Sequence, residues 1–363
     1  MFKHAANQKQ GESGRIEEST QLNSAENVEV RQIGAAILDT ALCRIWTVMR
    51  VCTILAVLLF IITTSCSKQF SPVENSSDQN KLVNVSEPQL LVENGKHAKW
   101  SPDDQWIAYA LYSGSSTDIY IASKDGGDAR QITNDISNEE QPFWSPDGSA
   151  IGFSSNTGEK QYHTIFTMVL DSNKITQATP DTIGVQSGDW SADGRHVVFD
   201  GVRKNKPANS IFIIELMSRQ LISLATNLAY AGRPQFSPDG AKIVFEALEH
   251  NSQIYNIWTM NSDGTELKQI TTDGGEYPCW SPDGNKIAYS NNRTGNYDLY
   301  IIDSNGGQPI QLTHSKETNE VRASWSSSEE YIIYDTMMGS ENVTPQNAGI
   351  YVIKIEFIAR ASK

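Results

Sequence analysis

The chain has 363 residues, carries a formal net charge of −14 at pH 7, and is 39% hydrophobic. This length is enough for a large core in one or two domains. Six basic and six acidic side chains fall within residues 1–65, so the rest of the chain carries the whole net charge. Such an acidic chain is a poor candidate for binding nucleic acid or an anionic membrane surface.

An apolar run near the N-terminus is the first recognisable segment. It extends from Val51 to Cys66 and is shorter than the roughly 20 residues that a membrane-spanning helix needs. With Arg50 before it and small residues at its end, it predicts a secretory signal peptide over residues 49–65. Because a signal normally begins the chain, we interpret Met49 as the start of translation and residues 1–48 as untranslated. The alternative is a genuine, disordered cytoplasmic tail.

The end of this run also predicts an anchor. Small residues followed by Cys66 resemble the lipobox of bacterial lipoproteins, which implies lipidation of Cys66 and a mature N-terminus there, and Ser67 resembles a signal for outer-membrane sorting. One acyl anchor attaches a protein to a membrane without spanning it. The alternative is an ordinary secretory signal. Since Cys43 and Cys52 lie upstream, Cys279 is left alone, and the mature chain has no intramolecular disulfide.

A polar segment over residues 66–87 predicts a flexible tether, and repeats begin after it. Each repeat has an aromatic anchor before a tight turn of the type Ser-Pro-Asp-Gly. The anchors are separated by 44 to 46 residues and are Trp100, Trp144, Trp190, Phe236, Trp280 and Trp325. A period of this length with four short strand signals per repeat indicates a β-propeller blade.

Two distances predict how the blades are built. Each anchor lies nine residues before an aromatic residue of a second strand, as in Trp100 to Tyr109. The turn between them fixes the register, with Pro setting φ and Asp and Gly accepting the later positions. We therefore assign these aspartates to the turn rather than to a calcium or catalytic site. The loops that vary in length join strands two to three and four to one, which places them at one end of the propeller, where binding usually resides.

The sixth repeat lacks a clear fourth strand. Residues Pro88 to Asn94 precede the first anchor and have the pattern of an unpaired fourth strand. We expect this segment to pair with the strand around Ile350 to Ile355 and so to remove the open sheet edges. The prediction is an all-β, six-bladed β-propeller over residues 88–363, with four antiparallel strands per blade, closed by an N-terminal strand.

The repeat unit resembles the PD40 (WD40-like) repeat of TolB-type propellers, and the resemblance covers residues 88–363. The fifth unit, "PCWSPDGNKIAYSNNRTGNYDLYIIDSNGGQPIQLT", carries it most fully. The resemblance implies the fold and leaves the function open, because such propellers serve many roles. TolB itself has an α/β domain before its propeller, where this chain has only the tether.

Signatures of an enzyme are scarce. The sequence has no P-loop, no H-E-x-x-H and no G-x-S-x-G motif, so we expect no catalytic residues, no cofactor and no metal. An alternative is a carbohydrate-active enzyme that resembles the metal-dependent propeller of oligogalacturonate lyases, since five histidines follow the signal. No two of them have a ligand-type spacing, however. They are His97, His163, His196, His250 and His314.

What remains is a binding surface at the variable end. The loops that lead into the first strands carry ten acidic side chains and five basic ones. This excess predicts that the mouth of the central channel of the propeller is acidic and suited to a basic peptide, a cation or a complementary protein. A merely solvated acidic surface is the alternative. We expect a monomeric, lipid-anchored periplasmic protein at the outer membrane that binds an envelope protein or peptide. The candidate partner-binding residues are Glu140, Glu276, Glu320, Arg233 and Arg322.

Overall fold

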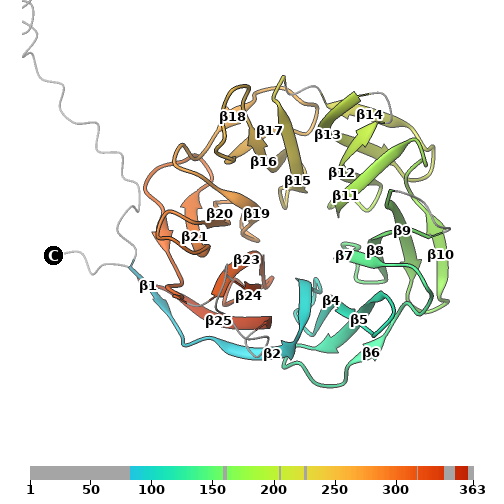
Figure 1. Ribbon diagram of the computed structural model, residues 1–363, viewed down its shortest axis with the longest axis horizontal. Coiled ribbons are helices and arrows are strands. Elements are labelled where there is room, and N and C mark those ends of the chain that lie inside the picture. The colour runs from blue at the N-terminus through green and yellow to red at the C-terminus, as the bar shows by residue number, and fades with distance from the viewer. Residues whose placement is uncertain are drawn as a thin grey trace, which may run out of the picture. The chain divides into compact units, whose positions relative to one another are not determined.

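The computed structural model describes residues 82–157, 162–203, 206–224, 227–316, 318–338 and 348–358. All the regular elements in these ranges are strands. Figure 1 shows them as six sheets arranged in a ring. Strands that follow one another within a sheet pair antiparallel. The predicted six-bladed β-propeller with four antiparallel strands per blade is therefore confirmed.

Within each blade, successive strands are placed side by side from the centre of the ring outward (Figure 1). The innermost strands are β3 (Gly95–Trp100), β7 (Glu139–Trp144), β11 (Ile183–Trp190), β15 (Tyr230–Phe236), β19 (Glu276–Trp280) and β23 (Thr318–Trp325). The second strands are β4 (Trp106–Tyr112), β8 (Ala150–Ser155), β12 (His196–Arg203), β16 (Lys242–Leu248), β20 (Lys286–Asn291) and β24 (Tyr331–Met338).

The outer half of each blade consists of a third strand and, in the first five blades, a short outermost strand. The third strands are β5 (Thr117–Ser123), β9 (Thr164–Val169), β13 (Lys206–Glu215), β17 (Asn256–Asn261), β21 (Asp298–Asp303) and β25 (Gly349–Ile358). The outermost strands of the first five blades are β6 (Arg130–Gln131), β10 (Lys174–Gln177), β14 (Leu221–Leu224), β18 (Lys268–Gln269) and β22 (Ile310–Gln311).

The turns that follow the first five anchors each contain an aspartate with a structural role. In the second blade, Asp147 Oδ1 accepts the Ser145 hydroxyl at 2.6 Å and the Ser149 N–H at 3.0 Å. Gly148 has a φ of 71°, which glycine adopts at no steric cost. These bonds lower the pKa of Asp147. The Ser-to-Asp bond recurs in the first, third, fourth and fifth turns, so the aspartates serve the turns.

The aromatic residue nine positions after the anchor pairs with an aromatic residue of the third strand. In the third blade, Phe199 lies opposite Phe212 in the ladder, and their ring centroids are 5.4 Å apart. Cross-strand aromatic pairs stabilise a sheet and fix its register. Equivalent stacked or tilted pairs are Tyr109–Tyr120, Phe153–Phe166, Tyr289–Tyr300 and Tyr334–Tyr351.

The sixth blade is completed by the N-terminal part of the described chain. Strand β2 (Gln89–Glu93) pairs antiparallel with β25, with Val92 opposite Ile350 and Glu93 opposite Gly349. The predicted pairing of Pro88–Asn94 is thus confirmed. A second strand, β1 (Leu82–Val85), pairs with the other half of β25, with Val85 opposite Ile355. Residues 82–85 were expected to belong to the tether, so the ordered body begins earlier than predicted.

The predicted signal peptide, the lipidated Cys66 and residues 1–48 all lie outside the described residues. Where the structure describes the chain, it contains no helix with the length and apolarity needed to cross a bilayer.

We predict that deleting residues 82–94 lowers the melting temperature strongly and causes aggregation. The deletion removes the two strands that cover β25 and exposes an unpaired strand edge. A chain that begins at residue 82 and keeps both strands is the control. Thermal unfolding followed by circular dichroism, with size-exclusion chromatography, tests this. Equal melting of the two chains would mean that β25 needs no partner.

Candidate functional site

The innermost strands share an irregularity that points side chains into the channel. In β3, the ladder to β4 shifts register between Lys96 and Lys99, and the other five innermost strands shift at similar places. Such β-bulges re-aim side chains and often lie near functional sites. The position three residues before the anchor has a positive φ in five blades, at His97 (59°), Gln141 (54°), Arg233 (52°), Tyr277 (55°) and Arg322 (57°).

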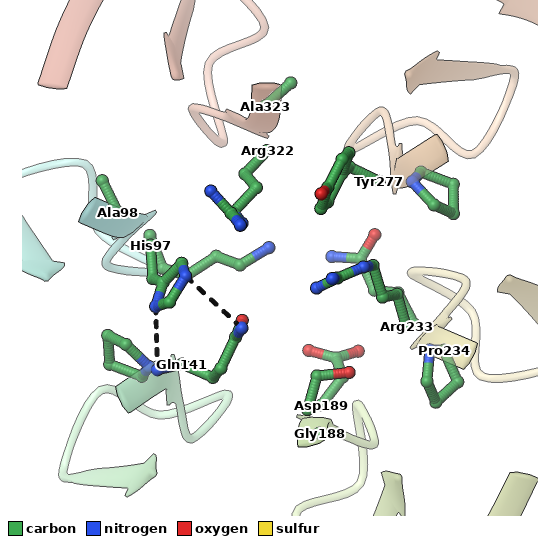
Figure 2. A pocket seen from close by; sticks show the side chains of 15 residues that line it. His97, Ala98, Gln141, Gly188, Asp189, Arg233, Pro234, Tyr277, Arg322 and Ala323 are labelled. Atoms are coloured by element: carbon green, nitrogen blue, oxygen red, sulfur yellow. Dashed lines mark hydrogen bonds between the residues drawn. The ribbon is translucent and has the colours of Figure 1, made fainter. Parts of the chain in front are cut away.

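These side chains surround a pocket at the centre of the ring. Figure 2 shows His97, Gln141, Arg233, Tyr277 and Arg322 directed toward a common space. The pocket has a volume of about 60 Å³ and is lined by residues from all six innermost strands. A non-glycine residue with positive φ is uncommon and costs conformational energy. Five of them facing one pocket mark it as the candidate site.

Buried carboxylates hold the two arginines of this ring. Arg233 Nε donates to Glu246 Oε1 at 3.0 Å, and Arg322 Nη1 lies 3.5 Å from Asp335 Oδ2. Each acid follows the anchor of its own blade by ten residues. Glu246 and Asp335 are only 3% and 1% exposed, so these are largely desolvated ion pairs, whose disruption is costly.

The same carboxylates also link neighbouring blades. Glu246 Oε2 accepts the Tyr277 N–H of the next blade at 2.9 Å, and Asp335 Oδ2 accepts the His97 N–H of the first blade at 2.6 Å. Both N–H groups lie in bulges, where no ladder partner is available. Each carboxylate therefore fixes an arginine of its own blade and the bulge of the following one. In the third blade, Asp200 accepts the Ser187 N–H of its own blade instead, at 2.8 Å.

One tyrosine lies against both arginines. The Cζ of Arg233 is 4.3 Å from the centroid of the Tyr277 ring, and the Cζ of Arg322 is 4.8 Å from it. Contacts between a guanidinium group and an aromatic ring are favourable, more so when they are desolvated. The Arg233–Tyr277–Arg322 cluster is thus formed by the fourth, fifth and sixth blades, and we use this name for it below.

Positively charged side chains outnumber negatively charged ones among the residues that line the pocket. Lys99, Arg233 and Arg322 line it, and Asp189 is the acidic residue among the lining side chains. Burial raises the pKa of Asp189 to about 6, although Lys99 opposes this shift. Burial, followed by the charge of Arg322, lowers the pKa of His97 well below its ordinary value, so His97 is neutral at pH 7.

The sequence had predicted an acidic mouth, and this expectation is wrong for the pocket. Glu140 pairs with Lys96, and Glu276 accepts the Tyr297 hydroxyl. Glu320 is 4% exposed, and burial raises its pKa to about 7. These three predicted binding residues do not line the pocket. The other two, Arg233 and Arg322, do.

Sequence reasoning missed the remaining members of the ring. Arg233 and Arg322 lie three residues before their anchors, and the same offset in other repeats finds His97, Gln141 and Tyr277. The spacing was therefore a usable signal. Tyr277 carries no formal charge, so charge by itself does not single it out.

The histidines do not form a metal centre in the described part of the chain. Within those ranges, no group of three or more His, Cys, Asp or Glu side chains could hold a metal ion. His97 is the histidine that lines the channel pocket. The Gln141 N–H lies 3.4 Å from its Nδ1.

Comparison with known proteins agrees with this architecture. Residues 93–208 and 184–354 match the family model described as the PD40, TolB beta propeller domain. The chain belongs to this family. Among curated relatives, the uncharacterized peptidase YuxL of Bacillus subtilis is 37% identical over 62 residues, which are 17% of this chain and 9% of that protein. The Tol-Pal system protein TolB of Francisella tularensis is 32% identical over 76 residues, which are 21% of this chain and 18% of that protein.

Solved structures extend the likeness of fold over most of the chain. The structure of TolB from Acinetobacter baumannii aligns with a TM-score of 0.58 at 20% sequence identity. The alignment covers 70% of this chain and 65% of the TolB chain. An oligogalacturonate lyase in complex with manganese has a TM-score of 0.54 at 16% identity and covers 75% of this chain and 81% of its own. At these identities the comparisons show a shared fold. The matched segments of the two curated relatives are less than a fifth of their lengths.

We predict that Asp335→Ala destabilises the protein by about 3 kcal/mol, because it leaves two buried N–H groups and the Arg322 guanidinium without their acceptor. The control is Ser154→Ala at the equivalent position of the second blade. There the hydroxyl makes one bond, to the Glu140 carbonyl, so the expected loss is about 1 kcal/mol. Urea unfolding measures both. Equal losses of unfolding free energy in the two variants would show that Asp335 has no special role in holding the side chains around the pocket.

Proposed function

We propose that this chain is a non-catalytic propeller of the bacterial cell envelope that binds a protein or peptide segment at the channel pocket. The observation that carries the proposal is the set of five side chains, from five blades, that positive-φ positions in the bulges direct into one pocket. Arginine and tyrosine are the residue types that contribute most binding energy in protein interfaces. Here Arg233, Tyr277 and Arg322 are oriented before a partner arrives, which reduces the entropy lost on binding.

The relatives support a partner of this kind. Several of them are described as Tol-Pal system protein TolB, a name that places those proteins in a multi-component system. The TolB-like fold and the predicted signal peptide together support a location in the periplasm. Anchoring through a lipidated Cys66 at the outer membrane is part of the same proposal, and the protein acts there as a monomer without nucleic acid.

The alternative function, a carbohydrate-active enzyme like the metal-dependent oligogalacturonate lyases, has less support. The fold is similar to that of such a lyase. However, the described residues provide no cluster of metal-binding side chains, and His97 lies beside cationic groups that disfavour a metal ion. Binding without catalysis is therefore the function that the site supports best.

We predict that the double substitution Arg233→Gln with Arg322→Gln abolishes capture of the envelope partner. Removing both guanidinium groups leaves Lys99 as the charged donor among the residues that line the pocket. The tagged protein is used to capture partners from crosslinked bacterial envelopes, which are quantified by mass spectrometry. The control is Lys124→Gln with Arg195→Gln. It changes the net charge equally, on turns of the opposite end.

Three results of this capture experiment are informative. Loss with the channel variant alone supports the proposal. Loss with the control alone would mean that the opposite end is the binding face. Unchanged capture by both variants would contradict binding at the channel pocket.

We predict that the mature protein begins with an acylated Cys66. The small residues before this cysteine motivate the prediction. Intact-mass and N-terminal peptide mass spectrometry of protein extracted from membranes should show the lipid, and Cys66→Ser should release the protein into the soluble envelope fraction. A mature species that retains residues 1–48 contradicts the prediction.

A further inference from the structure

We propose that the Arg233–Tyr277–Arg322 cluster recognises a carboxylate group of an acidic peptide segment. The inference rests on the proposed function and names the chemistry of the ligand. It reverses the expectation of a basic ligand, because the residues that face the pocket differ in charge from the protein as a whole.

Both guanidinium groups keep donors that the described residues do not use. Arg233 donates through Nε to Glu246. Arg322 makes two long contacts through Nη1, at 3.5 Å to Asp335 and 3.3 Å to Met337 Sδ, and its buried Nε has no acceptor among the described residues. A guanidinium group carries five N–H donors. Donors are therefore left over on both side chains, and Figure 2 shows both guanidinium groups directed into the pocket.

The two arginines lie against the same aromatic ring and line the same pocket. Since their Cζ atoms lie 4.3 and 4.8 Å from the same ring centroid, the two Cζ atoms are separated by at most the sum of these distances. A carboxylate has about four acceptor sites on two oxygens, so it can accept from both groups. Charge-assisted bonds of this kind are shorter and stronger than neutral ones.

The arginines are also held in place before binding. Their side chains are 23% and 18% exposed, and each is fixed by a carboxylate at its back and by the Tyr277 ring at its side. The carboxylates of Glu246 and Asp335 are almost completely buried. An incoming anion therefore meets the cationic groups and not these acids.

The size of the pocket and its single acidic side chain limit the anion. The volume of about 60 Å³ counts only the space that the centre of a water-sized sphere can occupy. One water needs roughly 10–15 Å³ of such space, so the pocket has room for a few water-sized groups. A carboxyl group with one or two methylenes therefore fits. Asp189 also lines the pocket and repels a doubly charged phosphate more than a carboxylate with one charge.

The test uses isothermal titration calorimetry of the full protein with acetyl-triglutamate amide. Acetyl-triglutamine amide is the neutral probe of the same length, and inorganic phosphate and trigalacturonate are the other anions. We expect triglutamate to bind and triglutamine to show no binding. Arg322→Gln should weaken triglutamate binding about tenfold or more, while Arg195→Gln, a change on an exposed turn, should leave it unchanged.

A second variant keeps the test valid if Arg322→Gln disturbs the fold. Arg322→Lys retains the charge beside Asp335 but loses the planar set of donors, so it should melt like the parent and bind triglutamate more weakly. Equal binding of the two peptides, or no effect of either Arg322 variant, overturns the inference. Tighter binding of phosphate or trigalacturonate than of triglutamate overturns it as well.

Failure of this inference is distinguishable from failure of the proposed function. If the channel substitutions abolish capture of the envelope partner but triglutamate neither binds nor competes with that partner, the pocket binds a protein through other chemistry. If triglutamate binds at the cluster and capture is unaffected, the site is real and the partner docks elsewhere.

Discussion

The pairing of β2 with β25 is the constraint on which the rest of the structure depends. Each blade packs mainly against its two neighbours, so the ring is complete only when the last blade has received its strands from the N-terminal side. The fit is close: a Cβ at Gly349 would lie 2.4 Å from the carbonyl oxygen of Val92. The channel pocket draws residues from all six innermost strands, and therefore exists only in the closed ring.

The same side chains at the centre of the ring stabilise the fold and position the residues of the channel pocket. Five innermost-strand residues adopt positive φ values, which costs conformational energy at each position. Glu246 and Asp335 offset part of this cost by accepting bulge N–H groups of the following blade, and they hold Arg233 and Arg322 at the same time. Burial raises the pKa of both acids, so keeping them ionised is itself unfavourable. Arg233 and Arg322 are therefore positioned by interactions that also join the blades.

The six repeats place five different residue types at one equivalent backbone position. Three residues before the anchor, the first two blades carry His97 and Gln141, which contact each other, and the last three contribute the Arg233–Tyr277–Arg322 cluster. Ten residues after the anchor, three blades carry acids and the other three carry small residues, namely Ala110, Ser154 and Ser290. A nearly symmetric scaffold thus surrounds an asymmetric pocket. The asymmetry comes from the side chains, because the six innermost strands are equivalent in the backbone.

The sequence by itself determined the number of blades, their register and the closure of the ring, because these follow from periodic spacing, turn chemistry and the missing sixth outer strand. It did not determine the charge of the channel. Glu140 and Glu276 precede the channel-facing position by one residue, and neighbouring residues of a strand point to opposite faces. They therefore bind Lys96 and Tyr297 instead. Only the tertiary structure decides this, because the bulges set which side chains enter the channel, and their positive φ values depend on acceptors that lie in another part of the ring.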